Sequence, residues 1–331
     1  MTTLPWLDAD SVARRLPFAA LIDALADAFE QSIEAPPRMH CDLGSAPERP
    51  EQRDLLVMPA WVPGAETGVK LVTLFEHNSE HESEHESEQN SERDRPRIQG
   101  VYVLFHPEHG GPQAVLDAAT LTTRRTAAAS ALAARYLSRP DAAHLLVCGS
   151  GRLAHALPEA YAAVRALRQV TVWARRADAA QRTAADLRSA LPGVAVTVAD
   201  DLEAAVRAAD MVTSAIPSTH AFIRGAWLRP GAHLDLIGSY RPTMHEADVE
   251  ALVRATLFVD TRDGVLSEAG EFIDALAAGS IESAHIVADL PDLVSGRHPG
   301  RRFDDEITLF KSVGTALEDL AGARLAVGRP D

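Results

Sequence analysis

The sequence predicts an α/β protein, a Rossmann doubly wound parallel sheet joined to a smaller α+β domain. Its 331 residues suit about two domains at roughly 150 residues each. From residue 144 onward, short apolar runs alternate with helical patterns, which is typical of a doubly wound sheet. A glycine-rich turn directly after the first of these runs supports the same fold. We place the Rossmann domain in residues 121–304 and the smaller domain in residues 1–120 and 305–331.

The composition excludes several classes of protein. The chain has 32 basic and 47 acidic residues, a formal net charge of −15, which disfavours binding to nucleic acid or to an anionic membrane. Its two cysteines, Cys41 and Cys148, cannot build a disulfide framework or a cysteine zinc site, and no metal is expected. The N-terminus lacks the apolar run of a signal peptide and no apolar stretch is long enough to span a membrane, so we expect a cytoplasmic protein.

The N-terminal part of the chain predicts helices followed by strands. Helical spacing of apolar residues indicates amphipathic helices from Asp10 to Ile33, with Ser11 as N-cap and with Pro36 and Pro37 ending the region. Apolar, partly β-branched segments then indicate a mixed or antiparallel sheet. These strands cover residues 55–59, 68–74 and 100–105.

An acidic insertion, residues 77–95, lies between the last two of these strands. It repeats His-Glu-Ser-Glu and contains no apolar residue. Such a segment cannot bury enough surface to offset its ordering entropy, so we expect a disordered, solvated loop. The spacing of His77, His81 and His85 would let them line one helical face as metal ligands, but the low-complexity composition favours the solvated loop.

The second half of the chain predicts one long helix and then alternating strands and helices. Alanine-rich residues 121–137 favour a helix, capped by Thr120 or Thr122. Strands are expected over residues 144–148, 170–174, 194–199, 211–216 and 233–239, and helices over 153–167, 179–191 and 202–208. Residues 307–325 predict a C-terminal helix that packs back on the first domain.

The first chemical motif is the turn Gly149-Ser150-Gly151-Arg152-Leu153-Ala154, a G-x-G-x-x-A string. Gly149 permits the tight turn, Gly151 lets a pyrophosphate approach the backbone, and Ala154 allows close helix–strand packing. The helix that follows presents N–H groups and a positive dipole to phosphates. Because a strand precedes the turn and a helix follows it, dinucleotide binding is favoured over a merely structural turn.

The next strand selects the dinucleotide. An Asp or Glu about 20 residues after the turn would bind the ribose 2′-hydroxyl of NAD. Here the strand ends in Ala174-Arg175-Arg176, and two guanidinium groups suit a 2′-phosphate. We therefore expect NADPH in preference to NADH, with two merely solvated arginines as the alternative.

Three cations are candidates for binding a substrate carboxylate. Lys70 lies inside an apolar strand, where a charge needs a partner or a ligand. Arg125 lies near the start of a helix, a poor position for a cation unless an anion binds there. Arg38 follows two prolines, and an Arg with a nearby Lys is what a carboxylate requires. Ordinary salt bridges explain each residue singly about as well.

Several sequence blocks resemble the ornithine cyclodeaminase/mu-crystallin family from about Pro36 to Leu325. The matching blocks, in order, are MPAW at Met58, GVKLVT at Gly68, RTAAASALAARYL at Arg125, GSGRLA at Gly149, AADMVTSAIPS at Ala208, RPGAHLDLIGS at Arg229, VDTRDGVLSEAGE at Val259 and EITLFKSVGTALEDLAGARL at Glu306. Their number and order make the resemblance more specific than any single motif.

The resemblance implies a homodimer whose smaller domain binds substrate and forms the dimer. It implies that Arg38, Lys70 and Arg125 surround the substrate carboxylate and nitrogen. Asp260 and Glu268 are expected to hold structure. The positions implied to contact the cofactor or the substrate beside it are Arg152, Leu153, Ser214, Ala215, Ile216, Gly238, Ser239, Ser312 and Val313.

Departures from the family pattern select an activity. Cyclodeaminases carry Gly-Gly-Asp-x-Pro with a catalytic Asp, whereas Tyr240 occupies that position here, and a phenol with a pKa near 10 is a poor substitute. The similarity therefore points to the reductase branch, which reduces Δ1-pyrroline-2-carboxylate or Δ1-piperideine-2-carboxylate to L-proline or L-pipecolate. Alternatives are an ornithine cyclodeaminase, an alanine dehydrogenase, and a mu-crystallin-like NADPH-dependent protein that binds a small ligand without catalysis.

The expected mechanism is hydride transfer to the C=N carbon of a cyclic imino acid. Because that carbon is electrophilic mainly when the nitrogen is protonated, an acid is needed nearby. Lys70 is the candidate proton donor, directly or through water, and Arg125 and Arg38 would fix the carboxylate. A purely electrostatic role for Lys70 is the alternative.

Overall fold

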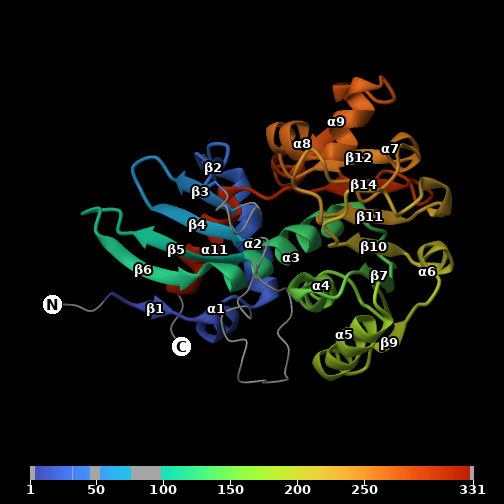
Figure 1. Ribbon diagram of the computed structural model, residues 1–331, viewed down its shortest axis with the longest axis horizontal. Coiled ribbons are helices and arrows are strands. Elements are labelled where there is room, and N and C mark those ends of the chain that lie inside the picture. The colour runs from blue at the N-terminus through green and yellow to red at the C-terminus, as the bar shows by residue number, and fades with distance from the viewer. Residues whose placement is uncertain (1–3, 32, 45–52, 76–97, 329–331) are drawn as a thin grey trace. The chain divides into compact units, whose positions relative to one another are not determined.

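A computed structural model describes residues 4–31, 33–44, 53–75 and 98–328 of the protein (Figure 1). The chain divides into two units. The first comprises Met1–Pro17, Ser32–Thr122 and Thr315–Asp331, and the second comprises Phe18–Gln31 and Thr123–Gly314. The acidic insertion with His77, His81 and His85 lies outside the described residues.

The first unit is built on a six-stranded sheet in the order β1-β6-β5-β4-β3-β2. The strands β1 and β6 are parallel, and every other neighbouring pair is antiparallel. The bounds are β1 Trp6–Leu7, β2 Met39–Asp42, β3 Arg53–Trp61, β4 Thr67–Phe75, β5 Ile98–Phe105 and β6 Pro112–Asp117. Two helices complete the described part of the unit, α1 Ala9–Arg15 and α11 Ala316–Gly328.

One face of this sheet is buried and the other is half-exposed. In β4 the buried positions are Gly68, Lys70, Val72 and Leu74, which alternate with half-exposed residues as the two-residue period of a strand requires. Helix α11 packs against β3, β4 and β5. The charged Lys70 therefore lies on the buried face, where the other three buried residues of β4 carry no charge.

The second unit contains an eight-stranded parallel sheet in the order β13-β12-β14-β11-β10-β7-β8-β9 (Figure 1). The bounds are β7 His144–Cys148, β8 Gln169–Trp173, β9 Ala195–Val198, β10 Met211–Ser214, β11 His233–Leu236, β12 Thr256–Val259, β13 Ile286–Asp289 and β14 Thr308–Lys311. The strand order reverses between β7 and β10, and dinucleotides bind at the carboxyl ends of the strands at such a switch point. The predicted Rossmann fold is confirmed.

Helices pack around the parallel sheet and bury its core. They are α2 Phe18–Glu30, α3 Ala118–Leu137, α4 Arg152–Ala162, α5 Ala177–Ala190, α6 Leu202–Ala208, α7 Val249–Arg254, α8 Arg262–Glu268, α9 Gly270–Ala277 and α10 Leu290–Val294, with the short 3-10 turns η1 Gly225–Trp227 and η2 Ser283–His285. The paired residues Leu146, Val212, Leu234 and Leu309 form one fully buried row across four strands. Cys148 is buried in the same core, as its place in the strand predicts.

The structure differs from the expected organisation at residues 305–314. The sequence predicts a helix over 307–325, but Thr308–Lys311 is the strand β14, which lies between β11 and β12. The helix is confined to α11 because Gly314, with φ +80°, separates strand from helix. Residues 305–314 therefore belong to the Rossmann unit.

A second difference concerns helix α2, which belongs to the second unit although it precedes the strands of the first. It contacts α10 and α4, and Asp23 on α2 pairs with Arg135 on α3 at 2.9 Å. The expected helix caps also differ. Asp8 rather than Ser11 caps α1, and α3 begins earlier than expected, where Asp117 accepts a hydrogen bond of 2.7 Å from the Thr120 N–H.

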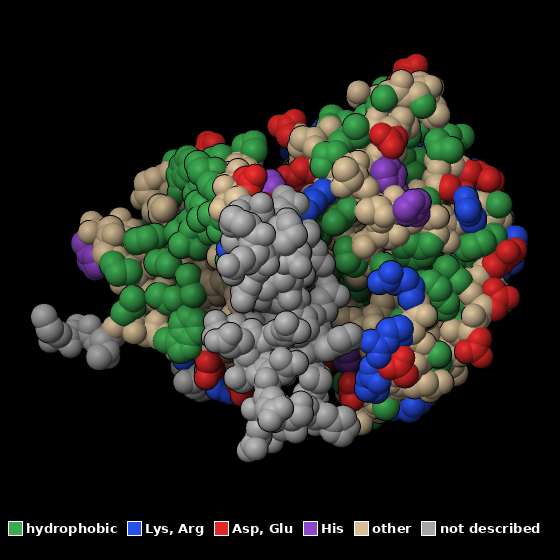
Figure 2. All heavy atoms as spheres, in the orientation of Figure 1, with side chains coloured by type: hydrophobic (Ala, Val, Ile, Leu, Met, Phe, Trp, Pro, Cys, Tyr) green, Lys and Arg blue, Asp and Glu red, His purple; other side chains and the backbone are tan. Residues whose placement is uncertain are grey.

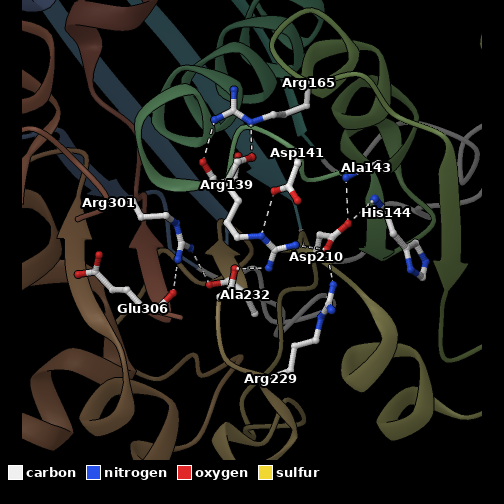
Figure 3. A network of polar contacts seen from close by, with 12 residues as sticks. Arg139, Asp141, Ala143, His144, Arg165, Asp210, Arg229, Ala232, Arg301 and Glu306 are labelled. Atoms are coloured by element: carbon white, nitrogen blue, oxygen red, sulfur yellow. Dashed lines mark hydrogen bonds and ion pairs between the residues drawn. The ribbon is translucent and has the colours of Figure 1, made fainter. Parts of the chain in front are cut away.

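A polar network joins the amino ends of the parallel strands (Figure 3). The carboxylate of Asp210 accepts hydrogen bonds from the N–H groups of Ala143 and His144, both at 2.9 Å, and from the guanidinium groups of Arg139 and Arg229. Nearby, Arg301 donates to the carbonyl groups of Ala232 and Glu306. Because this network lies at the edge opposite the strands' carboxyl ends, we assign it to the stability of the sheet.

Candidate active site

The turn after β7 has the geometry that a pyrophosphate needs. Gly149 has φ +136°, which favours glycine, and its N–H donates to the Trp173 carbonyl at 2.8 Å. Gly151 is the N-cap of α4 without a side-chain cap, and a Cβ added to it would have no atom within 4 Å. Ala154 is fully buried. Arg152 and Leu153 begin α4, so the strand, turn and helix that the motif requires are all present.

The two arginines after β8 differ in their surroundings. Arg176 is the N-cap of α5, and its guanidinium group lies 2.5 Å from Asp178. Arg176 and Arg182 together hold the pKa of the Asp178 carboxyl below its usual range. Arg175 is exposed and makes no hydrogen bond or ion pair with another described residue. Of the two predicted contacts for a 2′-phosphate, Arg175 is therefore the one whose charge is not already engaged.

Two predicted cofactor loops lie against each other at the carboxyl ends of β10 and β11. Ser214 ends β10 and is followed by Ala215 and Ile216, while Gly238 and Ser239 follow β11. A Cβ on Gly238 would lie 2.4 Å from backbone atoms of Ile216. Only glycine fits this approach, and the structure thus brings together the two loops that were predicted to face the nicotinamide.

A buried carboxylate, Glu246, joins these loops. Its Oε1 accepts from the Ser214 hydroxyl at 2.5 Å, and its Oε2 accepts from the N–H groups of Gly238 and Ser239 at 2.7 and 2.9 Å. Burial raises the pKa of Glu246 to about 7, while the positive charge of Lys311 opposes that shift. Glu246 could not be predicted from the sequence, since an acid in a loop carries no local signal of burial.

Lys311 and Glu271 complete the same cluster. The Lys311 ammonium group donates to the Ser239 hydroxyl at 2.5 Å and lies 3.5 Å from Glu246 and 3.4 Å from Glu271. Ser239 also donates to Glu271 at 2.8 Å. All of these side chains are buried. Lys311 carried the same sequence signal as Lys70, a charge in an apolar run, but the expected helix there concealed its place at the end of a strand.

Asp260 fixes the loop that follows β14. Its Oδ2 accepts from the Ser312 hydroxyl and from the N–H groups of Val313 and Gly314, at 3.0, 2.8 and 2.6 Å. Burial raises the pKa of Asp260, and these hydrogen bonds act in the opposite direction. Asp260 therefore holds structure, and it fixes two predicted site residues, Ser312 and Val313.

Arg125 lies against the end of this loop. It is 5% exposed, and a Cβ added to Gly314 would lie 2.4 Å from its Nη1 atom. Gly314 therefore leaves the space that the guanidinium group occupies. The neighbouring Arg124 is placed differently, with its guanidinium carbon 4.0 Å from the ring centroid of Phe18. Of these two adjacent arginines, Arg125 is the predicted ligand of the substrate.

Lys70 lies on the buried face of the six-stranded sheet and pairs with Asp319 of α11. The distance from Nζ to Oδ2 is 2.7 Å, and Nζ also donates to the Thr122 hydroxyl at 3.4 Å. Tyr102 is opposite Lys70 in the antiparallel register. Burial and the charge of Asp319 both raise the pKa of the Tyr102 phenol. The sequence pattern around Lys70 does not predict either neighbour, Asp319 or Tyr102.

Arg38 directly precedes β2, at the end of that strand where Met39 is opposite Val57. The residue after Val57, Met58, is opposite Lys70 in β4. Two strand spacings, about 10 Å, separate the backbones of β2 and β4. The first unit thus carries two of the three predicted cations, and Arg125 belongs to the second unit.

Among the residues that the structure describes, no group of three His, Cys, Asp or Glu side chains is placed to hold a metal ion. No helix in the same ranges combines the length and the apolar character that crossing a membrane requires.

A family model and several known proteins are similar to this chain. The model of the ornithine cyclodeaminase/mu-crystallin family matches residues 6–329. The Δ1-pyrroline-2-carboxylate reductase of Paracoccus denitrificans is 39% identical over 274 residues, which are 82% of this chain and 82% of that protein.

Two solved structures are similar over nearly the whole chain. The Δ1-pyrroline-2-carboxylate reductase of Thermococcus litoralis, in complex with NADH and L-proline, has a TM-score of 0.88 at 27% identity and covers 98% of this chain and 96% of its own. An archaeal alanine dehydrogenase dimer with bound NAD has a TM-score of 0.84 at 27% identity, with 98% and 95% covered. The predictions of fold, family and enzyme class are confirmed: this chain is an oxidoreductase and belongs to the ornithine cyclodeaminase/mu-crystallin family.

Proposed function

We propose that the protein reduces a cyclic imino acid with a nicotinamide cofactor, converting Δ1-pyrroline-2-carboxylate to L-proline, or the six-membered Δ1-piperideine-2-carboxylate to L-pipecolate. The observation that carries the proposal is the buried Lys70, whose charge is kept in an apolar sheet by Asp319. A buried, oriented ammonium group is a proton donor of the kind that an imine needs. The relatives named Δ1-pyrroline-2-carboxylate reductase support the same reaction.

The cofactor would be held by the second unit. Gly149 and Gly151 leave room for a pyrophosphate at the start of α4, and Arg152 and Leu153 would lie over it. When bound, the cofactor supplies a hydride to the substrate. The exposed Arg175 and the sequence Trp173-Ala174-Arg175-Arg176, which has no acid at the end of β8, favour NADPH over NADH, since a guanidinium group suits the 2′-phosphate.

The substrate carboxylate is assigned to Arg125, with Arg38 as a second cation. Arg125 is buried and oriented by Gly314, so little side-chain freedom is lost when an anion binds. Val313 would contact the ring of the substrate. Holding the acceptor carbon in a fixed place next to the hydride donor is the main contribution of such positioning residues.

The proton is assigned to Lys70. Transfer of its proton to the imine nitrogen makes the adjacent carbon electrophilic, and after hydride transfer the nitrogen is an amine. The Asp319 carboxylate, 2.7 Å from Nζ, holds the ammonium group of Lys70 in one orientation. Solvent can return the proton to Lys70 after product release.

Cyclodeamination of ornithine is less well supported. Tyr240, at the position of the cyclodeaminases' acid, is half-buried and lies beside Arg241, whose guanidinium carbon is 5.8 Å from the ring centroid. A neutral phenol cannot accept a proton as a carboxylate does at neutral pH.

The protein is further proposed to be a homodimer. Strands β4 and β5 carry the half-exposed apolar residues Val69, Leu71, Val101 and Val103 on the face that points away from Lys70. Figure 2 shows hydrophobic side chains gathered over the strands of this unit. A continuous apolar sheet face is a feature of protein interfaces, and a second copy of this chain is the occupant we propose.

The test is direct. Purified protein is mixed with Δ1-pyrroline-2-carboxylate and NADPH or NADH, and absorbance at 340 nm is followed. We expect oxidation of the cofactor and formation of L-proline. Pyruvate with ammonium and ornithine are run in parallel, because faster turnover of either would support alanine dehydrogenase or cyclodeaminase activity instead. Tight cofactor binding without turnover of any substrate would indicate a binding protein.

A further inference from the structure

The cluster of Glu246, Glu271 and Lys311 has no role in the mechanism above, although it lies directly behind the two predicted nicotinamide loops. Its three side chains come from the loop after β11, from α9 and from the end of β14. All three are at most 4% exposed. Burying three ionisable groups has an unfavourable desolvation free energy, which only close pairing and hydrogen bonds offset. Such a cluster therefore needs an explanation beyond packing.

The hydrogen bonds around Glu246 suit an ionised carboxylate. Four donors surround it: the N–H groups of Ile216, Gly238 and Ser239, and the Ser214 hydroxyl. Lys311 supplies a positive charge at 3.5 Å. The cluster thus contains two carboxyl groups and one ammonium group, so its acidic groups outnumber its basic group.

The position of this charge matters because of what lies in front of it. The cluster is at the carboxyl ends of β10, β11 and β14, on the far side of the switch point from β8, whose end receives the adenosine ribose. The nicotinamide half of a dinucleotide is therefore the half nearer to the cluster. The nicotinamide ring is neutral when reduced and carries one positive charge after it has donated its hydride.

We propose that Glu246, together with Glu271 and Lys311, is an electrostatic positioning element that stabilises the oxidised, cationic nicotinamide relative to the reduced one. This inference rests on the proposed function, because it requires a nicotinamide cofactor. Glu246 acts through the loops it holds and through its charge, without touching the reacting atoms. By favouring the cationic product form of the cofactor, the cluster makes hydride donation more favourable.

The ionisation of Glu246 is linked to binding of the oxidised cofactor. Burial raises its pKa to about 7, and Lys311 lowers it while Glu271 raises it. Cys148 lies at the end of β7, where burial and the charge of Glu246 both raise the pKa of its thiol. The thiol therefore stays neutral. A positive charge arriving in front of the loops favours the ionised form of Glu246, so binding of the oxidised cofactor is expected to strengthen as the pH rises through neutrality.

The experiment measures two dissociation constants, for NADPH and for NADP⁺, at pH 8 in the wild type and in Glu246→Gln. Glutamine keeps the shape of the side chain and removes its charge. If Glu246 has only a structural role, the substitution weakens the binding of NADPH and of NADP⁺ equally. If it has the proposed role, the substitution raises the ratio of Kd for NADP⁺ to Kd for NADPH by about fivefold. Coupling between partly buried unit charges is of this order.

Two further variants complete the design. Glu271→Gln removes the second negative charge while leaving the Glu246 hydrogen bonds in place, and we expect the ratio to rise again; this variant also serves if Glu246→Gln does not fold. Asp274→Asn is the matched control, because Asp274 also lies on α9 but its side chain is 71% exposed; its ratio should equal that of the wild type. If Glu246→Gln and Glu271→Gln both bind the two cofactors with an unchanged ratio of Kd for NADP⁺ to Kd for NADPH, the inference is wrong and the proposed function still stands. A wild type that binds neither cofactor would overturn the proposed function with it.

Discussion

The ammonium group of Lys70 lies 2.7 Å from a carboxylate oxygen of Asp319, and both side chains are almost completely buried. The pair joins β4, an inner strand of the six-stranded sheet, to the helix α11. Removing one member of a buried pair leaves the other charge without compensation, which destabilises proteins by about 3–5 kcal/mol. Stability and catalysis are thus linked at this residue, and an experiment must separate them.

Replacing Lys70 with Met is expected to lower kcat by about 100-fold or more, because the proton donor is lost. The same change leaves Asp319 buried alone and lowers the free energy of unfolding. A double variant, Lys70→Met with Asp319→Leu, removes both charges. We expect it to recover most of the stability, measured by urea unfolding, without recovering kcat. Recovery of kcat in the double variant would show that Lys70 donates no proton.

Gly314→Ala is expected to disturb Arg125 directly. The added Cβ would lie 2.4 Å from Nη1 of Arg125, at a backbone φ of +80°. The guanidinium group must move, so we expect KM for the imino acid to rise about tenfold, with a smaller change in kcat. Gly296→Ala is the matched control, since Gly296 has φ +71° but open space around it. Equal effects of the two changes on KM would mean that backbone strain alone is responsible.

The two arginines after β8 are expected to behave differently. Arg175→Ala should raise the Kd for NADPH about tenfold and leave the Kd for NADH nearly unchanged, because only NADPH carries the 2′-phosphate. Arg176→Ala should have the smaller effect, since Asp178 already engages that guanidinium group. Titration of each variant with both cofactors by fluorescence measures these constants. If Arg175→Ala weakens NADPH and NADH equally, the assignment to the 2′-phosphate is wrong.

The buried His233 predicts how stability depends on acid pH. Burial lowers its pKa to about 3, with Arg301 and Arg165 contributing in the same direction. Between that value and an ordinary pKa near 6.5, the unfolded chain binds a proton that the folded protein does not, so stability falls as pH falls.

His233→Asn is expected to remove about 1.4 kcal/mol per pH unit from the slope of unfolding free energy between pH 6 and 4.5. Asparagine retains a group able to bond Thr308, the present partner of Nδ1 at 3.0 Å. His220→Asn, at an exposed position, should leave the slope unchanged. The measurement is a series of urea unfolding curves, and an unaltered slope in His233→Asn would contradict the prediction.

The half-exposed face of the six-stranded sheet predicts the assembly. Leu71→Glu places a charge in the middle of that face and is expected to shift the protein from dimer to monomer in analytical ultracentrifugation. Val253→Glu is the control, because Val253 is 59% exposed on α7 of the other unit. A wild type that sediments as a monomer, or a Leu71→Glu variant that remains dimeric, would place the interface elsewhere or exclude it.

Local patterns in the sequence predicted the parallel sheet and the nucleotide turn well, because both depend on neighbouring residues. The run before Gly149 is apolar and the segment after it is helical, so strand, turn and helix follow from one short stretch. Lys70 was predictable for a similar reason, as a charge inside an apolar strand. Its partner Asp319 was not, since only the packing of α11 on the sheet brings the two together.

The error at residues 307–325 has a physical cause. The short run Thr308–Lys311 fits a strand or the start of a helix equally well, and the alanine-rich residues after it favour a helix. Its two neighbours in the sheet decide the outcome, and they lie far away in the sequence. The same error concealed Lys311, and with it the charged cluster behind the nicotinamide loops.

The position of β14 has a consequence for biosynthesis. It is the last strand of its sheet along the chain, yet it fills an inner place between β11 and β12. Until β14 has left the ribosome, β11 and β12 each have an edge with unpaired backbone N–H and C=O groups. Such edges can pair with strands of other chains and cause aggregation. The Rossmann sheet therefore closes only after Lys311 has been synthesised, and we expect the nascent chain before that point to depend most on chaperones.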